Sequence, residues 1–585
     1  MADLLLSEVD MRFQLFDWLK LEERLEGSEF DGEMAESYFD LSRKLSVDHF
    51  LPHYKTADVI EPRLEDGQVM VLPEIGKALA EFREAGLFGA SFPEDLGGMG
   101  LPYLVTSAAY SWFAAANCSS IGYTMLTGAN ARLISAFGSA AQIDRFARPQ
   151  IEGRWFGTMC LSEPQAGSGL GDVRTRAVLD GEDTHGQRYR LKGNKMWISG
   201  GDQDISENIV HLVLAKVPLA DGRLPEGTGG ISLFIVPKVL FDGNKNDIAV
   251  AGLNHKMGNR GTSNCLLNFG EQDGAIGWMV GEPGQGLRQM FMMMNEARIA
   301  VGFGAAALAC RGYLLAAEYA RERLQGRPAE RRDGPPVAII EHTDVRRMLL
   351  AARSYAEGAM GLCLLSAALV DRPDDADDVA LLELLTPVTK TFASEYGPKA
   401  NDLAIQIHGG YGYTRDFDVE QLYRDNRLNP IHEGTTGIQA ADLLGRKILR
   451  DGRGLKVLAE RIALTCQKGA QSADLADAAL ALSAAFQQVE TTLEAVHAMP
   501  NERQLDNAAA FQTAFGLVVV AWIWLDQALV AAELSDASPE AEKLRQGKMS
   551  TCHYFFAWEL PQASPLLTQI ASGSDVTRST DPNFF

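Results

Sequence analysis

Residues 424–439 read Arg-Asp-Asn-Arg-Leu-Asn-Pro-Ile-His-Glu-Gly-Thr-Thr-Gly-Ile-Gln, which places the carboxylate of Glu433 directly before a Gly-Thr-Thr-Gly turn. Pro430 and apolar residues precede it, and a helical pattern over 438–448 follows. Apolar surroundings disfavour the charged form of a carboxylate and can make it a competent base. The turn offers backbone N–H groups and hydroxyls that suit an anion or oxyanion. Taken alone, the segment equally fits a helix cap, which is the commoner use of such a carboxylate.

The composition is that of a globular protein with more than one domain. The chain has 585 residues, of which 46% are hydrophobic and 22% charged, so it is long and apolar enough to bury large cores. The net charge of −23 argues against nucleic acid or an anionic membrane as a general partner. The longest apolar run, 514–525, is shorter than the about 20 residues that span a bilayer, so we expect a buried helix.

The N-terminus and the cysteines indicate a cytoplasmic protein. The first ten residues carry acids where a signal peptide needs bases. The seven cysteines are scattered without a CxxC pair, which suits a reducing compartment and gives no sign of a zinc site.

Hydrophobic periodicity divides the chain into helical, β-rich and again helical parts. It predicts helices over 39–50, 71–84, 103–116, 129–137, 290–323, 342–370, 379–403, 455–467, 473–499, 506–534 and 540–560. Between them it predicts two strands around a Gly193-Asn194 turn, further strands over 209–217 and 230–236, and a long polar loop over 217–230. With a linker at 451–454, we predict a mainly α protein with a small central β domain, divided as 1–156, 157–280, 281–450 and 455–585.

Two further motifs carry possible chemistry. The loop 160–171, Cys-Leu-Ser-Glu-Pro-Gln-Ala-Gly-Ser-Gly-Leu-Gly, combines small residues that allow close backbone approach with hydroxyls that bind ring edges or phosphates. Trp197 and Ser199 lie two positions apart on a predicted strand and so share a face, where they could flank a flat cofactor. An ordinary surface loop and a half-buried core tryptophan fit the same patterns.

The combination and order of these motifs closely resemble the acyl-CoA dehydrogenase family of flavoproteins, over about residues 40–450. The strongest matches are the Leu-Ser-Glu-Pro-x-Ala-Gly-Ser loop at 161–168, the Gln-x-x-Gly-Gly-x-Gly run at 406–412 and Glu433-Gly434-Thr435. The resemblance implies the family's fold: an N-terminal helical domain, a β-barrel-like sheet domain and a C-terminal four-helix bundle, here followed by an extra helical domain.

The resemblance also implies FAD as cofactor and an acyl-CoA as substrate. By position, Leu161, Ser162, Ser168, Trp197 and Ser199 match flavin-side contacts, and Ser168 also lies near the CoA. Arg323, Gln325, Gln406, Gly409 and Gly410 match contacts to the FAD of a neighbouring subunit, while Thr435 and Gly437 match FAD contacts just after the base. Asn295, Arg298 and Gly434 are expected to contact the substrate.

Glu433 matches the family's catalytic base. In the family this carboxylate removes the α-proton of the thioester while hydride leaves the β-carbon, and the thioester oxygen is stabilised by the backbone N–H of the base and a ribityl hydroxyl. The chain departs from the pattern at Gly169, where the family loop usually has Asp, and at His432, where an aromatic residue is common. His432 either packs as a neutral ring or adjusts the pKa of the base. The alternative base position of some members is Ala297 here, with Glu296 about 100° away around the helix.

The chain as a whole is most similar to the roughly 600-residue bacterial branch, which has a C-terminal helical extension and tends to form homodimers. The resemblance implies fatty acid β-oxidation chemistry that yields a trans-2-enoyl-CoA, with an electron-transfer flavoprotein as acceptor. An acyl-CoA oxidase, a dehydrogenase of a thioether or branched acyl-CoA, and a catalytically silent scaffold are the alternatives.

Overall fold

The computed structural model describes residues 4–328 and 333–585, without the side chains of 292–294. Its contacts form two compact units. The first unit joins the segment up to Ser37 to Val301–Phe585, and the second unit is Tyr38–Ala300. The segment before Tyr38 therefore contacts the C-terminal part of the chain, whereas the sequence pattern placed it with the N-terminal helices.

The helices of the second unit surround one long buried element, α6 (Tyr103–Phe137). The two helices predicted within it are continuous except at Asn117, whose φ of −161° and ψ of 88° are not helical. The Asn117 amide donates to the Phe50 carbonyl (3.2 Å) and accepts from the Ser120 N–H (3.3 Å), which stabilises the break. The other helical elements are η3 (Ser46–Phe50), η4 (Leu51–His53), α4 (Tyr54–Val59), α5 (Pro73–Glu84), η5 (Leu87–Gly89), η6 (Glu94–Leu96), α7 (Ala140–Gln142), η7 (Ile143–Ala147) and α8 (Arg148–Ile151), while α3 (Gly32–Leu45) leads in from the first unit.

The sheet of the second unit closes on itself. Its strands are β3 (Trp155–Cys160), β4 (Arg176–Asp183), β5 (Gly186–Ser199), β6 (Asn208–Lys216), β7 (Ile231–Pro237), β8 (Ile248–Leu253), β9 (Asn264–Phe269) and β10 (Ala275–Met279). Their order is β10-β7-β6-β4-β5-β9-β8, with β3 parallel to β6, and β10 pairs with β5 as well as β7. This second pairing of β10 gives the barrel-like form expected from the sequence. A separate hairpin joins β1 (Arg63–Glu65) to β2 (Gln68–Met70).

The predicted turn at Gly193-Asn194 is absent, because β5 runs through it as one strand. A Cβ at Gly193 would lie 2.3 Å from Thr175 Oγ1 and 2.7 Å from Thr175 Cα, so glycine serves a close approach between neighbouring segments. The strand β6 is buried on both faces. Its Val210, Leu212 and Leu214 pack in one core and Val213 and Ala215 in the other, which follows from the two-residue alternation of a strand.

The first unit is helical. It begins with α1 (Glu8–Arg12), η2 (Phe13–Trp18) and α2 (Leu21–Leu25), and its central helices are α9 (Gly286–Glu322, of which the part from Val301 belongs here), α10 (Thr343–Val370) and α11 (Ala376–His408). The shorter elements η9 (Ile339–Glu341), η10 (Gly409–Tyr413), α12 (Val419–Asn426), α13 (Thr436–Ala441) and η11 (Asp442–Asp451) follow along the bundle. The helix predicted over 438–448 thus forms as α13 and η11.

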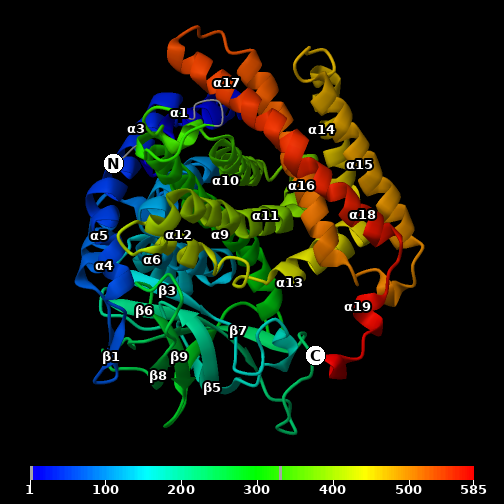
Figure 1. Cartoon of the computed structure of the whole chain (residues 1–585). Helices are drawn as coiled ribbons and strands as arrows, with labels where there is room; N and C mark the ends of the chain where they lie inside the picture. The colour runs from blue at the N-terminus through cyan, green and yellow to red at the C-terminus, as the bar shows by residue number, and fades with distance from the viewer. Residues whose placement is uncertain (1–3, 329–332) are drawn as a thin grey trace. The chain divides into compact units, whose positions relative to one another are not determined.

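The C-terminal extension packs as α14 (Arg453–Gly469), α15 (Ala476–His497), α16 (Ala508–Ala532), α17 (Pro539–Tyr554) and α18 (Ala563–Ala571), with η12 (Asn501–Arg503), η13 (Phe555–Glu559), η14 (Leu560–Gln562), α19 (Val576–Ser579) and η15 (Pro582–Phe584) (Figure 1). Gly358 and Gly361 let α10 approach α16, because a Cβ there would lie 2.8 Å from Trp524 and 2.6 Å from Gln527. The predicted linker at 451–454 is a one-residue break at Gly452, between η11 and α14.

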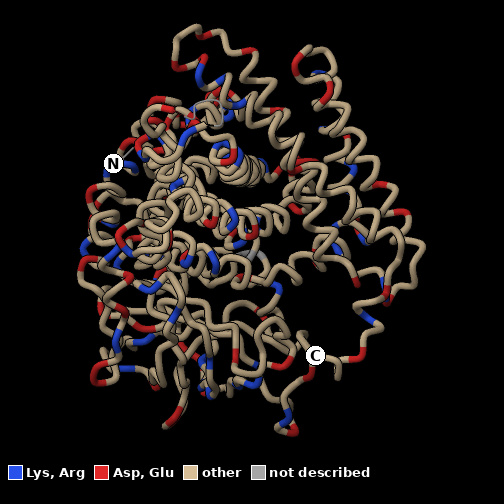
Figure 2. Tube along the Cα trace, viewed as in Figure 1, with Lys and Arg blue, Asp and Glu red and all other residues tan. Residues whose placement is uncertain are grey.

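Within residues 4–328 and 333–585, three helices, α9, α10 and α16, are long and apolar enough to cross a membrane by length and composition. Most of the apolar part of each is buried inside the protein, and the buried helix expected over 514–525 is confirmed in α16. Acidic and basic residues are interspersed along the trace (Figure 2). No disulfide forms among the seven cysteines, all of which lie in the part of the chain that the structure describes.

Candidate active site

Trp197 is turned out of the sheet by a bulge in β5. The pairing of β5 with β9 shifts register between Lys195 and Ile198, and Trp197 has a φ of 65°. Its side chain is 58% exposed, whereas Ile198 is buried. Ser199 is half-buried, and its hydroxyl accepts a 3.2 Å hydrogen bond from Asn264 Nδ2. The tryptophan is therefore not a core residue, and its exposed ring suits stacking on a flat group.

The loop that holds Leu161, Ser162 and Ser168 begins alongside this bulge. Lys195 Nζ donates to the Leu161 carbonyl (3.0 Å), and the Met196 N–H donates to the Ser162 carbonyl (3.0 Å). Leu161 and Ser162 are half-buried, and Ser168 is exposed farther along the loop. The structure thus brings Leu161 and Ser162 next to the strand that carries Trp197 and Ser199.

A buried carboxylate, Glu163, fixes the loop. Its Oε1 accepts from Lys195 Nζ (3.0 Å), the Thr175 N–H (3.0 Å) and the Thr175 hydroxyl (2.6 Å), and its Oε2 accepts from the Arg174 N–H (2.7 Å) and Gln165 Nε2 (2.7 Å). Burial alone would raise the pKa of Glu163, but the Lys195 ammonium and these donors lower it to about 2. Neither residue was assigned a role from the sequence, although a lysine inside an alternating strand is a signal for such a pair.

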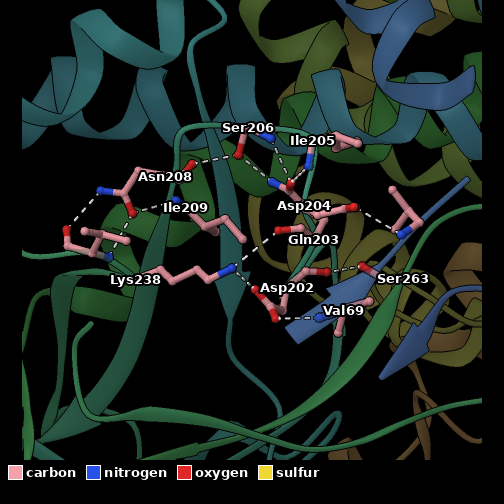
Figure 3. A network of polar contacts seen from close by, with 12 residues as sticks. Val69, Asp202, Gln203, Asp204, Ile205, Ser206, Asn208, Ile209, Lys238 and Ser263 are labelled. Carbon is pink, nitrogen blue, oxygen red and sulfur yellow. Dashed lines mark hydrogen bonds and ion pairs between the residues drawn. The ribbon is translucent and has the colours of Figure 1, made fainter. Parts of the chain in front are cut away.

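The segment after Ser199 is held by a polar network (Figure 3). The Asp202 carboxylate accepts from the Val69 N–H (3.0 Å) and pairs with Lys238, while the Ser263 hydroxyl donates to the Asp202 carbonyl (2.8 Å). The Gln203 side chain accepts from the N–H groups of Ile205 (2.6 Å) and Ser206 (3.0 Å). This network fixes the segment after β5 against β2 and against Lys238, which directly follows β7.

These features fit the isoalloxazine side of FAD. An exposed aromatic ring on a constrained backbone lies on one segment, and a small-residue loop with hydroxyls lies beside it.

The start of α9 carries the predicted substrate-side residues. Arg298 and Ala297 are each 3% exposed, and Asn295 is half-buried. Glu296 pairs with Arg132 Nε at 2.8 Å. Burial raises the pKa of Glu296 and the Arg132 guanidinium opposes that effect. The Glu296 carboxylate is thus held in an ion pair with Arg132.

In the first unit, Glu433 occupies a strained turn. Its φ is 51° and that of Gly434 is 87°, while the Thr436 N–H donates to the Pro430 carbonyl (3.1 Å). Left-handed backbone is rare for a residue with a side chain. Thr435 is the N-cap of α13 but its hydroxyl makes no capping bond, and Gly437 is exposed.

The surroundings of His432 favour its neutral form. Burial chiefly, and the Lys390 ammonium secondly, lower its pKa to about 3. Its Nε2 lies 3.0 Å from Asn429 Oδ1. Packing as a neutral imidazole agrees with these contacts, and an effect of the ring on the pKa of Glu433 stays a hypothesis.

The residues expected to reach a neighbouring subunit's FAD lie on two segments. Arg323 and Gln325 follow α9, and Gln406, Gly409 and Gly410 lie at the end of α11 and in η10; all five are exposed. The Arg323 guanidinium lies over the Tyr411 ring, 5.7 Å from its centroid, so the segments are neighbours.

Family models cover most of the chain. They are the acyl-CoA dehydrogenase N-terminal domain at residues 46–154, the middle domain at 158–271, the C-terminal domain at 284–449, and an acetyl-CoA dehydrogenase C-terminal-like domain at 458–581.

Curated relatives match almost the whole length. The chain is 37% identical to 3-methylmercaptopropionyl-CoA dehydrogenase of Ruegeria pomeroyi, with 96% of each chain covered. It is 32% identical to the broad-specificity linear acyl-CoA dehydrogenase FadE5 of Mycobacterium tuberculosis (94% of this chain and 95% of the relative) and 32% identical to a butyryl-CoA dehydrogenase of Syntrophomonas wolfei (93% of each).

Solved structures show the same fold at low identity. Caenorhabditis elegans ACDH-11 in complex with C11-CoA has a TM-score of 0.76 at 20% identity, covering 98% of this chain and 94% of that one. The acyl-CoA dehydrogenase of Bacillus anthracis complexed with FAD has a TM-score of 0.74 at 20% identity, covering 99% and 93%. The chain therefore belongs to the acyl-CoA dehydrogenase family, whose members are FAD-dependent oxidoreductases acting on the CH–CH group of acyl-CoA.

Proposed function

We propose that the protein converts an unbranched acyl-CoA to its trans-2-enoyl-CoA with Glu433 as the base, as in fatty acid β-oxidation. The observation that supports this most directly is where backbone strain falls. Among the described residues, Lys20, Asp66, Trp197, Asn259 and Glu433 have positive φ without being glycine. Strained backbone persists where the surroundings enforce it and clusters at functional sites. Two of these five residues are the base and the flavin-side tryptophan inferred from the sequence.

The chemistry needs a carboxylate that accepts one proton. Glu433 takes the α-proton of the thioester, the β C–H bond breaks with its electron pair leaving as hydride, and the Cα=Cβ bond forms. FAD, when bound, supplies the acceptor for that hydride. Leu161, Ser162, Ser168, Trp197, Ser199, Thr435 and Gly437 would hold FAD, and Asn295, Arg298 and Gly434 the substrate. Backbone N–H groups at the turn stabilise charge that develops on the thioester oxygen.

The relatives support an unbranched acyl chain. The substrates in their names are butyryl-CoA, linear acyl-CoAs and 3-methylmercaptopropionyl-CoA, and the last is a straight chain with sulfur in place of one methylene. Anaerobic flavin bleaching with butyryl-, 3-methylmercaptopropionyl-, isobutyryl- and long-chain acyl-CoAs tests the choice. Fastest bleaching by the branched substrate would contradict it.

We also propose an electron-transfer flavoprotein as the acceptor and a cytoplasmic homodimer as the working form. Exposure of Arg323, Gln325, Gln406, Gly409 and Gly410 supports contacts to a second subunit's FAD. Fast turnover in air with stoichiometric peroxide would instead identify an acyl-CoA oxidase. A monomeric mass in sedimentation, with FAD bound, would reject the intersubunit contacts.

The base assignment is tested by Glu433→Gln. We expect the variant to keep its flavin spectrum and to lose about 10²–10⁴-fold in the anaerobic bleaching rate, which is the usual contribution of a positioned base. Glu296→Gln is the matched control, because Glu296 is the other carboxylate near a known base position and pairs with Arg132. It should bleach within a few-fold of wild type. Bleaching by Glu433→Gln at the wild-type rate would show that the base lies elsewhere, and a purified protein that binds no FAD would favour the silent scaffold.

A further inference from the structure

The turn that carries Glu433 is held from behind by a buried lysine of α11. Lys390 is fully buried, and its Nζ donates to the carbonyl oxygens of Asn429 (2.7 Å) and Gly434 (2.8 Å). These carbonyls lie on either side of Glu433 in the sequence. A single ammonium thus ties together the two ends of the segment whose middle has the left-handed backbone.

A second set of hydrogen bonds supports the same segment. Gln439 Nε2 donates to the Glu433 carbonyl (3.0 Å). Asn429 Nδ2 donates to Asn426 Oδ1 (2.9 Å), and Asn426 Nδ2 donates to the Ala305 carbonyl (3.0 Å) on α9. The turn is therefore joined to the bundle through buried polar groups, and the lysine is the charged member of the set.

We infer that Lys390 is a positioning residue for the catalytic base: its two hydrogen bonds keep the 429–434 turn in the strained conformation that presents the Glu433 carboxylate. This inference rests on the proposed function. A charged donor makes stronger hydrogen bonds to carbonyl oxygens than a neutral donor does. Without it, the turn can relax to ordinary backbone angles and move the carboxylate. A misplacement of about 1 Å can lower a rate about 10²-fold even when it originates away from the reacting atoms.

The competing explanation is that Lys390 matters only for folding, as a buried lysine elsewhere would. Lys548 provides the comparison within the same unit. It is also fully buried, and its Nζ contacts Glu357 (3.0 Å), Gln527 Oε1 (3.0 Å) and Asp10, far along the chain from the turn. Lys390→Met and Lys548→Met remove the same charge and nearly the same volume, so they separate the two explanations.

The experiment measures both variants as flavin-loaded full-length protein. Four quantities are measured: bound flavin, the limiting rate of anaerobic bleaching, the dissociation constant of the acyl-CoA, and amide hydrogen exchange over 429–439. The substrate is butyryl-CoA or 3-methylmercaptopropionyl-CoA, whichever bleaches the wild-type flavin faster. For Lys390→Met we expect a limiting rate lowered about 10²-fold, a dissociation constant within a few-fold of wild type and faster exchange in the turn. Lys548→Met should lose thermal stability and keep its limiting rate. Lys390→Arg, which retains charged donors, should recover part of the rate.

The outcomes are decisive in either direction. A wild-type limiting rate for flavin-loaded Lys390→Met, with Glu433→Gln inactive, overturns the inference and leaves the proposed function intact. An active Glu433→Gln removes the proposed function itself. If Lys390→Met does not retain flavin, Lys390→Gln takes its place, and the results expected for Lys390→Met apply to it. Failure of both to fold, while Lys548→Met folds, means a purely structural role and also overturns the inference.

Discussion

Lys195 Nζ and Glu163 Oε1 are 3.0 Å apart inside the second unit, with side chains 0% and 3% exposed. The pair joins the two segments that we propose contact the flavin, because Glu163 lies in the Leu161–Ser168 loop and Lys195 precedes Trp197 on β5. A buried pair that is broken on one side leaves an uncompensated charge, which is strongly destabilising.

Glu163→Gln should therefore lower the free energy of unfolding by about 3–5 kcal/mol and weaken FAD binding. The matched control is Glu207→Gln, since Glu207 pairs with Arg154 at 3.0 Å with both side chains about half exposed, and exposed pairs contribute about 0–1 kcal/mol. Urea unfolding and flavin titration of the apoprotein check both. Equal losses in the two variants would contradict the role assigned to the buried pair.

The same carboxylate predicts a pH dependence of stability. Its pKa of about 2 lies below the ordinary value near 4.5, so the folded state favours the charged form. The stabilisation is complete above the unfolded pKa and is lost as pH falls toward 2. Urea unfolding between pH 5 and pH 2.5 should show a steeper loss for wild type than for Glu163→Gln, and parallel curves would refute the prediction.

His432 should leave no trace in the pH profile of the reaction. A pKa of about 3 lies far below neutral pH, so the ring should not change its charge near neutrality. His432→Phe keeps a ring and removes the 3.0 Å contact with Asn429, so the bleaching rate should change modestly. When that rate is plotted against pH, the midpoint of the fall on the acid side should stay in place. Loss of a limb near the ordinary histidine pKa of about 6.5 would show that the ring does titrate.

The glycine at 437 offers a test of cofactor contact that does not depend on the base. Apart from its chain neighbours and the nearby backbone of its own helix, a Cβ there would meet no protein atom within 4 Å, and the same holds for Gly304, which is also helical and in the same unit. Alanine should stabilise either helix by about 0.5–1 kcal/mol in the apoprotein. Only Gly437→Ala should weaken FAD binding, as measured by flavin titration. Equal FAD affinity in both variants would remove Gly437 from the cofactor contacts.

The motifs predicted the family fold and the closed sheet, because Glu433, Trp197 and the Gly/Ser loop carry recognisable residue types at fixed spacing. They did not predict the residues that hold these motifs in place. Lys390 and Glu163 act through hydrogen bonds to backbone groups distant in sequence. The sequence indicates them only by a single charge, which lies within an apolar helix for Lys390 and within a small-residue loop for Glu163. The turn predicted at Gly193 is wrong because glycine serves both turns and close packing, and only the neighbouring Thr175 distinguishes the two. Similarly, the segment before Tyr38 has helical periodicity that does not reveal which core it joins.

The buried charges around Lys548 predict that this N-terminal segment and the C-terminal extension unfold together with the bundle. Asp10 comes from α1, Glu357 from α10 and Lys548 from α17, and Arg353 Nε donates to Glu357 Oε1 (2.7 Å). Burial raises the pKa of Asp10, and the neighbouring Glu357 raises it further. For Glu357, burial opposes the charged form, but Arg353 and Lys548 lower its pKa overall.

Glu357 therefore carries the negative charge that pairs with the fully buried Lys548 and the partly buried Arg353. Glu357→Gln should lower the free energy of unfolding by about 3–5 kcal/mol, because it leaves Arg353 and Lys548 without that charge. Asp10→Asn should have a smaller effect, since an amide oxygen can still accept from Gln14 Nε2, now 2.7 Å from the Asp10 carboxylate. Urea unfolding, followed by tryptophan fluorescence and far-UV circular dichroism, checks which substitution lowers the free energy of unfolding more. The transitions from the two probes should coincide if the three segments form one cooperative unit. A separate early transition, or an Asp10→Asn loss as large as that of Glu357→Gln, would show that the extension is held by other contacts.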